Sequence, residues 1–420
     1  MTIVASGCAP PPGVAAVEQA TTTGLVQVTG FGNDYDHINM WKYVPAGMPA
    51  NAPLVLALHP CGYTAPLDDF AAKIGWNALA DKYKFYVVYP EQIAANNSLY
   101  CFNWAGDNTA SDGTNQPNNL IRGMGENQEI INMVKKMETD YSIDPSRVFI
   151  TGFSGGGAQT ALMLAVWPDV FAAGASLEGV AYHCTLNKNE VSSPCMNPGK
   201  DLTAQQWGDF VRMALPSGYA GPWPRLQIWE GSSDTFVGVD NVNELVKQWT
   251  NVLGIAATPI SDKVQGNDHA VYKDGAGNVA IESYMISGMS HAVALDPTKG
   301  CGTADGNYYV DKGICSTELV AEFFGLQNPP NVGGGSDGGG IGDGGGAGGG
   351  GGGGAGGGGG SGGAGGGGGG NWITPGSGGS TPPTACHGCS AAGGGASDAV
   401  WAIAVVAVMM QRRRKRNGLA

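Results

Sequence analysis

A glycine-rich tract divides this chain and limits the part of it that can fold. Glycine supplies 72 of the 420 residues and is concentrated between residues 332 and 370. Such a segment has almost no side chain to bury and is expected to behave as a flexible tether. The residues before it are rich in aliphatic and aromatic side chains, as expected for one domain with a continuous core. We predict a single folded domain over residues 21–328 and a disordered linker over residues 329–384.

Apolar runs alternate with helix-like segments through residues 25–326, which is the pattern of an α/β sheet. The expected strands begin at Leu25, Ile38, Pro53, Phe85, Arg147, Phe171, Arg225 and Ile281. The expected helices cover residues 68–82, 125–141, 155–166 and 239–253. The central apolar runs are continuous, so we expect those strands to be covered on both faces. The sequence therefore predicts a mostly parallel, doubly wound α/β sheet.

The chain is acidic, with a formal net charge of −13, although five basic residues are concentrated at positions 412–416. An acidic surface repels the phosphate backbone of nucleic acids. We therefore expect no nucleic-acid partner for the main domain and consider neutral substrates more compatible with it.

The cysteines indicate the compartment in which the domain folds. Six of the nine cysteines lie in the main domain, without a metal-type CxxC pair. Two close pairs, Cys184 with Cys195 and Cys301 with Cys315, bracket loop-like sequence, as disulfides of an oxidising compartment do. We predict an exported protein, and the alternative is a cytosolic enzyme with buried free thiols.

Residues 1–20 are expected to be a flexible N-terminal segment. They are too short to hold the charged and apolar regions of a secretory signal. Ala5-Ser6-Gly7-Cys8 resembles the end of a lipoprotein signal in which the cysteine becomes lipid-modified. The alternative is a plain flexible terminus.

Residues 385–420 are predicted to form a sorting or membrane tail. A CHGC sequence at Cys386 is followed by twelve apolar residues, 399–410, and then by the basic cluster. Twelve residues are fewer than the roughly 20 that span a bilayer, and basic residues after an apolar run fit a cytoplasmic stop. The tail resembles the MYXO-CTERM sorting tail of myxobacterial envelope proteins, which implies processing near Cys386 or Cys389; the alternative is a single-span anchor. Both interpretations give the tail membrane or sorting machinery as its partner and place the main domain outside the cytoplasm.

The sequence Gly152-Phe153-Ser154-Gly155-Gly156 stands between an apolar strand and an Ala/Leu-rich helix. This is GxSxG in the strand-turn-helix context that exposes a nucleophilic serine above a sheet. The helix N-terminus also points backbone N–H groups at a developing oxyanion. Ser154 is the candidate nucleophile; the alternative is a capping serine in a glycine-rich turn.

A serine nucleophile requires an imidazole base that is oriented by a carboxylate. In α/β-hydrolases these residues occur along the chain in the order Ser, Asp, His, and each lies in a loop after a strand. Asp234 and His291 follow Ser154 in this order, and each comes just after a predicted strand. The competing residues are His269 as a fallback base and Asp209 and Asp240 as acids, both of which lie in or beside predicted helices.

The second oxyanion donor is expected in the loop His59-Pro60-Cys61-Gly62 after the third strand. Proline has no N–H, so we assign the backbone N–H of Cys61, paired with that of Gly155. A disulfide from Cys61 to Cys101 would hold this loop rigid, although a merely structural cysteine fits equally well.

The blocks LALHPCG, CFNWAGD, RGMGENQEI, ITGFSGGGAQT, EGSSDTFV and GMSHAV resemble the extracellular poly(3-hydroxybutyrate) depolymerase and feruloyl/acetylxylan esterase group of α/β-hydrolases. The resemblance implies the α/β-hydrolase fold, a triad of Ser154, Asp234 and His291, oxyanion donors at Cys61 and Gly155, and neither metal nor cofactor. The chain departs from the group in having His-Pro-Cys where His-Gly-Cys is usual, and Phe-Ser-Gly where Leu-Ser-Ala is frequent.

These features predict a secreted carboxylic ester hydrolase that works through an acyl-enzyme. The expected substrate is a polymeric ester, first a poly(3-hydroxybutyrate) or other polyhydroxyalkanoate, and the catalytic domain is expected to be monomeric. Tyr63 and Trp104 are candidates for an apolar substrate-binding wall, with core packing as the alternative. The competing functions are a feruloyl or acetylxylan esterase and a surface-binding protein that has lost catalysis.

Overall fold

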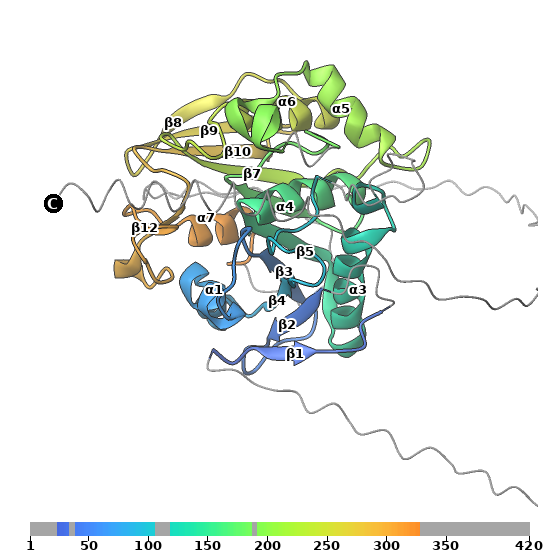
Figure 1. The fold of residues 1–420 in the computed structure, drawn as a ribbon, viewed down its shortest axis with the longest axis vertical. Coiled ribbons are helices and arrows are strands. Elements are labelled where there is room, and N and C mark those ends of the chain that lie inside the picture. Colours follow the sequence, from blue (N-terminus) through green and yellow to red (C-terminus); the bar gives the residue numbers. More distant parts are fainter. Residues whose placement is uncertain (1–22, 33–37, 106–117, 187–190, 328–420) are drawn as a thin grey trace, which may run out of the picture. The chain divides into compact units, whose positions relative to one another are not determined.

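The computed structural model describes residues 23–32, 38–105, 118–186 and 191–327 (Figure 1). They all belong to one compact unit, Met1–Gly335. The predicted N-terminal segment 1–20 with Cys8, the linker 329–384 and the tail 385–420 lie outside the described residues. Among the residues described, none of the helices has both the length and the apolar character needed to cross a membrane.

In the described part of the chain, ten strands form one sheet in the order β1-β2-β4-β3-β5-β6-β7-β10-β9-β8. Neighbours from β4 through β10 are parallel, whereas β1, β2, β9 and β8 pair antiparallel at the two edges. The prediction of a mostly parallel sheet is therefore confirmed. The strands are β1 (Val26–Val28), β2 (Asn39–Tyr43), β3 (Ala52–Leu58), β4 (Tyr86–Glu91), β5 (Ile143–Phe153), β6 (Ala173–Leu177), β7 (Arg225–Gly231), β8 (Ile260–Val264), β9 (Asn267–Lys273) and β10 (Val279–Ile286).

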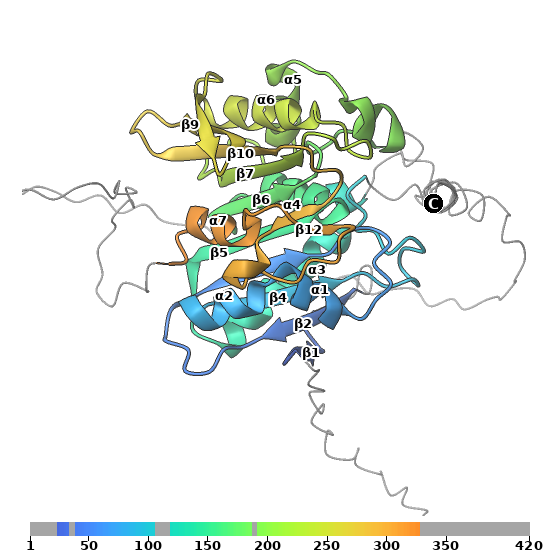
Figure 2. The same cartoon turned by 90° about the vertical axis from the view of Figure 1, so that its left-hand side faces the viewer.

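Helices cover both faces of the sheet, as the continuous apolar strands predict. Every residue of β3 is buried, and successive side chains point to opposite faces. Leu54, Leu56 and Leu58 enter one core, and Val55 and Ala57 enter the other. On the first face lie α3 (Gly125–Asp140), α4 (Gly155–Val166), α5 (Ala204–Met213) and α6 (Asn241–Leu253). On the second lie α1 (Leu67–Ile74), α2 (Trp76–Tyr83), α7 (Ser316–Phe323) and the small sheet of β11 (Val293–Leu295) and β12 (Tyr309–Asp311), which Figure 2 shows in front.

The single helix predicted over residues 68–82 is wrong, because Gly75 divides it into α1 and α2. Gly75 has a φ of 81°, a left-handed conformation that ends one helix and begins the next. A Cβ atom at this position would lie 2.7 Å from the backbone nitrogen of Gly302. The break is thus fixed by a tertiary contact with a distant loop, which helical periodicity does not reveal.

Helix α5 and the antiparallel strands β8 and β9 are not among the elements expected from the sequence. Helix α5 begins with a reciprocal capping box between Thr203 and Gln206, a signal that was present in the sequence. Strand β8 is exposed along nearly its whole length, so it lacks the apolar alternation on which strand prediction rests.

His269, the fallback base, lies in β9 and serves the packing of this edge. Its Nδ1 lies 2.6 Å from Asp262 Oδ1 and its Nε2 lies 2.7 Å from Glu282 Oε1. The ring also packs on Tyr284, with 4.5 Å between centroids. Burial lowers the pKa of His269, but the hydrogen bonds to the two carboxylates outweigh it and raise the pKa overall.

We therefore expect His269→Gln to destabilise the domain more at pH 6 than at pH 9. A raised pKa means that the folded state binds the proton more tightly, so the stabilisation is fully present at low pH and is lost as pH rises through the folded-state pKa. The melting temperature should fall by about 2–4 °C more at the lower pH, while ester hydrolysis is unchanged. Thermal melts at both pH values, with the unaltered chain as reference, measure this; a pH-independent loss would contradict it.

Candidate active site

Ser154 stands on a strained turn between β5 and α4. Its φ of 57° and ψ of −117° are rare for a residue with a side chain, and its N–H donates to Leu177 O at 2.8 Å. The flanking glycines permit the turn, because a Cβ on Gly152 would lie 2.3 Å from Gly156 O and one on Gly156 would lie 2.4 Å from Leu58 O. This is the geometry that exposes a serine at the carboxyl end of a central strand.

The loops after β7 and β10 bring Asp234 and His291 to this turn. The two strands are parallel neighbours, so their carboxyl ends meet at one edge, and the Ser233 N–H donates to Met289 O at 2.8 Å across the two loops. His291 Nε2 lies 2.8 Å from Ser154 Oγ, and His291 Nδ1 lies 2.6 Å from Asp234 Oδ2. The structure thus brings the three predicted residues into one hydrogen-bonded line.

Asp234 is held as an anion by several hydrogen bonds. Its Oδ1 accepts from the N–H groups of Phe236 at 2.6 Å and Val237 at 3.1 Å. Burial raises its pKa, but the hydrogen bonds from His291, Glu178 and the backbone prevail and lower the pKa to about 2. An ionised Asp234 requires the proton of the neutral imidazole on Nδ1, which leaves Nε2 free to accept the proton of Ser154.

The candidate oxyanion donors, Gly155 and Cys61, lie beside each other. A Cβ on Gly155 would lie 3.3 Å from Cys61 N, 2.3 Å from Cys61 Sγ and 3.1 Å from Cys101 Sγ. Gly155 opens α4, so its N–H has no acceptor within the helix. The Cys61–Cys101 disulfide is present and occupies the space that an alanine side chain would need, which accounts for glycine after the nucleophile in this chain.

His59 fixes the peptide plane that presents the Cys61 N–H. It is 1% exposed, and its Nε2 accepts from the Gln92 N–H at 3.0 Å. The proton of the neutral ring therefore resides on Nδ1, which donates to Pro60 O at 2.8 Å. Burial lowers the pKa of His59 to about 4, so this arrangement persists at neutral pH. Because Pro60 O and Cys61 N belong to one peptide unit, the imidazole orients the donor.

Glu126, which the sequence analysis did not single out, anchors the segment that carries Cys101. Its carboxylate accepts from the Asn103 N–H and the Asn103 side-chain amide, both at 2.7 Å, and from Asn96 at 3.0 Å. It also accepts from the Gln92 side-chain amide, which donates to Cys101 O at 3.1 Å as well. The only indication of its importance in the sequence was its position in the RGMGENQEI block, one of the blocks that carry the family resemblance.

Among the described residues, three disulfides are present, and they join the pairs expected from the sequence, Cys61–Cys101, Cys184–Cys195 and Cys301–Cys315. Trp104 is buried in the core on the sheet face that α3 and α4 cover, which agrees with the alternative that this residue serves core packing. Tyr63 is half-buried, packs on Phe70 and donates to Asp69 at 2.6 Å. A contact of either residue with substrate stays a prediction.

Glu178 is a further functional candidate that the sequence analysis missed. Its Oε2 lies 3.2 Å from His291 Nδ1, and donor atoms of Glu178, Asp234 and His291 lie within 4.8 Å of one another. That spacing also suits a metal ion. The 2.6 Å between Nδ1 and Asp234 Oδ2 is a hydrogen-bond distance, however, whereas two ligands of one tetrahedral ion would lie more than about 3 Å apart.

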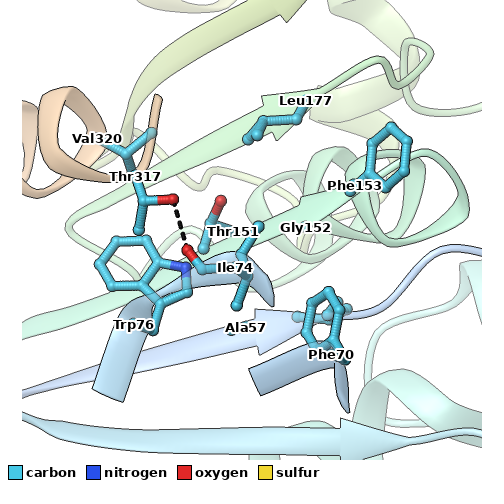
Figure 3. Close-up of a pocket in the computed structure, with 11 residues that line it drawn as sticks. Ala57, Phe70, Ile74, Trp76, Thr151, Gly152, Phe153, Leu177, Thr317 and Val320 are labelled. Carbon is cyan, nitrogen blue, oxygen red and sulfur yellow. Dashed lines mark hydrogen bonds between the residues drawn. The ribbon is translucent and has the colours of Figure 1, made fainter. Parts of the chain in front are cut away.

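A small cavity of about 10 Å³ lies below the serine turn, among residues of β3, β5, α1, α2 and α7. Figure 3 shows Phe153, Gly152 and Thr151 along one side, and Thr317, which donates to Ile74 O at 2.8 Å. A space of this size holds about one water molecule, so it belongs to the packing beneath the turn and not to substrate binding.

Comparison with known proteins identifies the family. The esterase PHB depolymerase family matches residues 39–194. Poly(3-hydroxyalkanoate) depolymerase C of Paucimonas lemoignei is 44% identical over 319 residues, which cover 75% of this chain and 73% of that protein. The chain belongs to this family. It is a carboxylic ester hydrolase.

This chain is also similar to two acetylxylan esterases. The acetylxylan esterase of Coprinopsis cinerea is 35% identical over 72% of this chain and 73% of its own length. The structure of an acetyl xylan esterase from Aspergillus awamori matches with a TM-score of 0.59 and 26% identity, over 72% of this chain and 99% of that one. The α/β-hydrolase fold expected from the sequence is therefore confirmed.

We expect Gly155→Ala to destabilise the esterase by about 1–3 kcal/mol, the usual cost of overpacking, because the added methyl group would meet the Cys61–Cys101 disulfide. The cost should shrink when Cys61 and Cys101 are both replaced by alanine. Denaturant unfolding of the four variants of this double-mutant cycle measures the coupling. Gly275→Ala, with open space around its Cβ, is the matched control, and equal costs in both cysteine backgrounds would contradict the explanation.

Proposed function

We propose that this protein is an exported serine esterase that hydrolyses the ester bonds of a polyhydroxyalkanoate such as poly(3-hydroxybutyrate). The observation that carries the proposal is the line from Ser154 Oγ through His291 to Asp234, at 2.8 and 2.6 Å, next to the N–H groups of Cys61 and Gly155. Ser154 is the nucleophile, His291 the base, and Asp234 the carboxylate that orients it.

The reaction is acyl transfer in two halves. Ser154 Oγ attacks the ester carbonyl while His291 Nε2 takes its proton, and the resulting oxyanion accepts hydrogen bonds from the Cys61 and Gly155 N–H groups. The carbon–oxygen bond to the alcohol then breaks, and His291 returns the proton to the leaving oxygen. Water, deprotonated by the same nitrogen, attacks the acyl-enzyme and releases the acid. Asp234 stays ionised and stabilises the imidazolium in both halves.

The relatives favour a polyester over a polysaccharide ester. The 44% identity to a poly(3-hydroxyalkanoate) depolymerase exceeds the 35% identity to the acetylxylan esterase of Coprinopsis cinerea over nearly the same share of the chain. A neutral polyester also suits an acidic protein of net charge −13. Acetylxylan is the second candidate substrate, supported by the structural match that covers 99% of the acetyl xylan esterase chain.

Export is supported by the three disulfides, which are typical of proteins that fold in oxidising compartments. On this basis the enzyme acts outside the cytoplasm on a substrate too large to enter a cell. We further propose that the tail at residues 385–420 attaches the enzyme to the membrane or is processed by sorting machinery that attaches or releases it. The catalytic domain is proposed to be monomeric.

The test is release of soluble acid from emulsified poly(3-hydroxybutyrate) by the full chain, purified from an oxidising compartment. Acetylxylan, methyl ferulate and short p-nitrophenyl esters serve as comparison substrates. Ser154→Ala should lower kcat by about 10⁴-fold or more, because the nucleophile is lost, with an unchanged melting temperature. Clearing of the polymer supports the depolymerase function, whereas cleavage of acetylxylan or ferulate alone would assign the enzyme to polysaccharide esters. An active Ser154→Ala variant would remove Ser154 from the mechanism.

A further inference from the structure

Three carboxyl groups are clustered beside His291, two of them next to its ring and the third next to those two, although a serine esterase needs only one. Glu178 follows β6 with a φ of 53°, and its N–H donates to Trp229 O at 2.8 Å. Glu230 lies in the next strand, β7, where Leu177 pairs with Trp229 one position earlier. Asp234 follows in the turn after the same strand. The side chains of Glu178 and Asp234 are 0% exposed, and Glu230 is buried as well.

Glu178 lacks the hydrogen bonds that a buried carboxylate requires. Among the described residues, no N–H or O–H group donates to either of its carboxyl oxygens. An ionised carboxylate without donors is costly to bury, whereas a protonated one has an O–H group that can donate to a neighbouring carboxylate. Asp234 is such a neighbour, because a carboxylate oxygen of Asp234 lies within 4.8 Å of one of Glu178, and hydrogen bonding with Glu178 contributes to the lowered pKa of Asp234.

The electrostatics agree with this assignment. Burial raises the pKa of Glu178 well above its usual value, and the nearby carboxyl groups of Glu230 and Asp234 raise it further. Burial likewise raises the pKa of Glu230 well above its usual range, again with a contribution from Asp234. Asp234 alone has a lowered pKa, of about 2. These directions make Asp234 the member of the cluster that ionises most readily.

We propose that Glu178 is a positioning residue: as a neutral carboxylic acid it donates a hydrogen bond to Asp234 and thereby holds that carboxylate against His291 Nδ1. The inference rests on the proposed roles of Ser154, His291 and Asp234. It assigns to Glu178 no contact with substrate.

The neutrality of Glu178 matters for the base. Asp234 and Glu178 lie 2.6 and 3.2 Å from the same ring nitrogen. Two anions at these distances would favour the imidazolium over the neutral ring, and an imidazolium cannot accept the proton of Ser154. One anion and one neutral donor orient the ring and leave it able to act near neutral pH. The charged and titratable groups that face Glu178 are His291, Asp234 and Glu230; Phe153 and Phe236, which also pack on His291, are uncharged.

Two substitutions of nearly equal size separate a neutral donor from an anion. In Glu178→Gln the amide N–H can still donate to Asp234, whereas Glu178→Met fills the space without a donor. With the full chain and a soluble p-nitrophenyl ester, we expect kcat of the Gln variant to stay within about threefold of the unaltered enzyme. The Met variant should lose about tenfold or more in kcat, as expected for a hydrogen bond to a charged group, with KM unchanged. Its melting temperature should be equal or higher, because an apolar side chain replaces a buried acid.

The pH profile of kcat/KM decides the charge of Glu178. The acidic limb should not move in the Gln variant, because that variant replaces one neutral group by another. A limb that moves to lower pH in this variant would mean that Glu178 is an anion, and a Met variant with full kcat would mean that it only fills space; either result overturns the proposal. Glu244→Gln is the matched control, since Glu244 is also buried but accepts a hydrogen bond from Trp207 Nε1 at 2.6 Å, and it should leave kcat and the profile unchanged.

A spectroscopic measurement keeps the inference independent of ester hydrolysis. The proton shared between His291 Nδ1 and Asp234 should give a low-field ¹H resonance in the unaltered protein and in the Gln variant, and a shifted or broadened one in the Met variant. If no ester is cleaved by any form, the proposed function fails while this comparison still decides the role of Glu178. Identical resonances in all three proteins would overturn it.

Discussion

The contact between the Ser154 turn and the end of β3 is backbone against backbone, and the rest of the site depends on it. A single Cβ on Gly156 would lie 2.4 Å from Leu58 O, so no larger residue permits the approach. The contact places the first N–H of α4 beside the loop after β3, which carries Cys61, the proposed second oxyanion donor. The Cys61–Cys101 disulfide then covers Gly155 and leaves no room for the alanine that is frequent after the nucleophile. The close approach at Gly156 and the cover over Gly155 thus account for the glycines after Ser154 and for the proximity of the two proposed donors.

Much of this arrangement is predictable because parallel strands impose it. Residues that follow the carboxyl ends of β5, β7 and β10 must meet at one edge of the sheet, and Ser154, Asp234 and His291 each follow one of these strands. The apolar runs that gave the strands are those buried on both faces, where the physical signal is strongest. Strand β8 was not predicted for the same reason. Its side chains face solvent, so the sequence carries no periodic apolar pattern there.

The features that the sequence did not reveal are those created by tertiary proximity. Gly75 breaks a helix because Gly302 approaches its backbone, and nothing within ten residues of Gly75 records that approach. In the sequence, Glu178 looks like an ordinary acidic residue in a loop after a strand. Its burial beside other carboxyl groups becomes apparent only in the structure, where β6 pairs with β7. The tautomer of His59 is decided by an N–H of Gln92, 33 residues away. Sequence patterns reveal periodicity along the chain, whereas the positions of protons depend on which groups come into contact in the folded structure.

Two requirements of a polymer esterase conflict, and a gradient of exposure reconciles them. Electrostatic stabilisation of an imidazolium is strong only away from water, whereas a polymer cannot enter a closed interior. The Asp234 and Glu178 side chains are 0% exposed, that of His291 is 9% exposed, and Cys61 is exposed. The charge of Asp234 is therefore kept away from water while the partly exposed Ser154 faces outward, and the imidazole ring connects the two environments. A deeper site would favour small esters, and a shallower one would expose Asp234 to water and weaken its hold on the base.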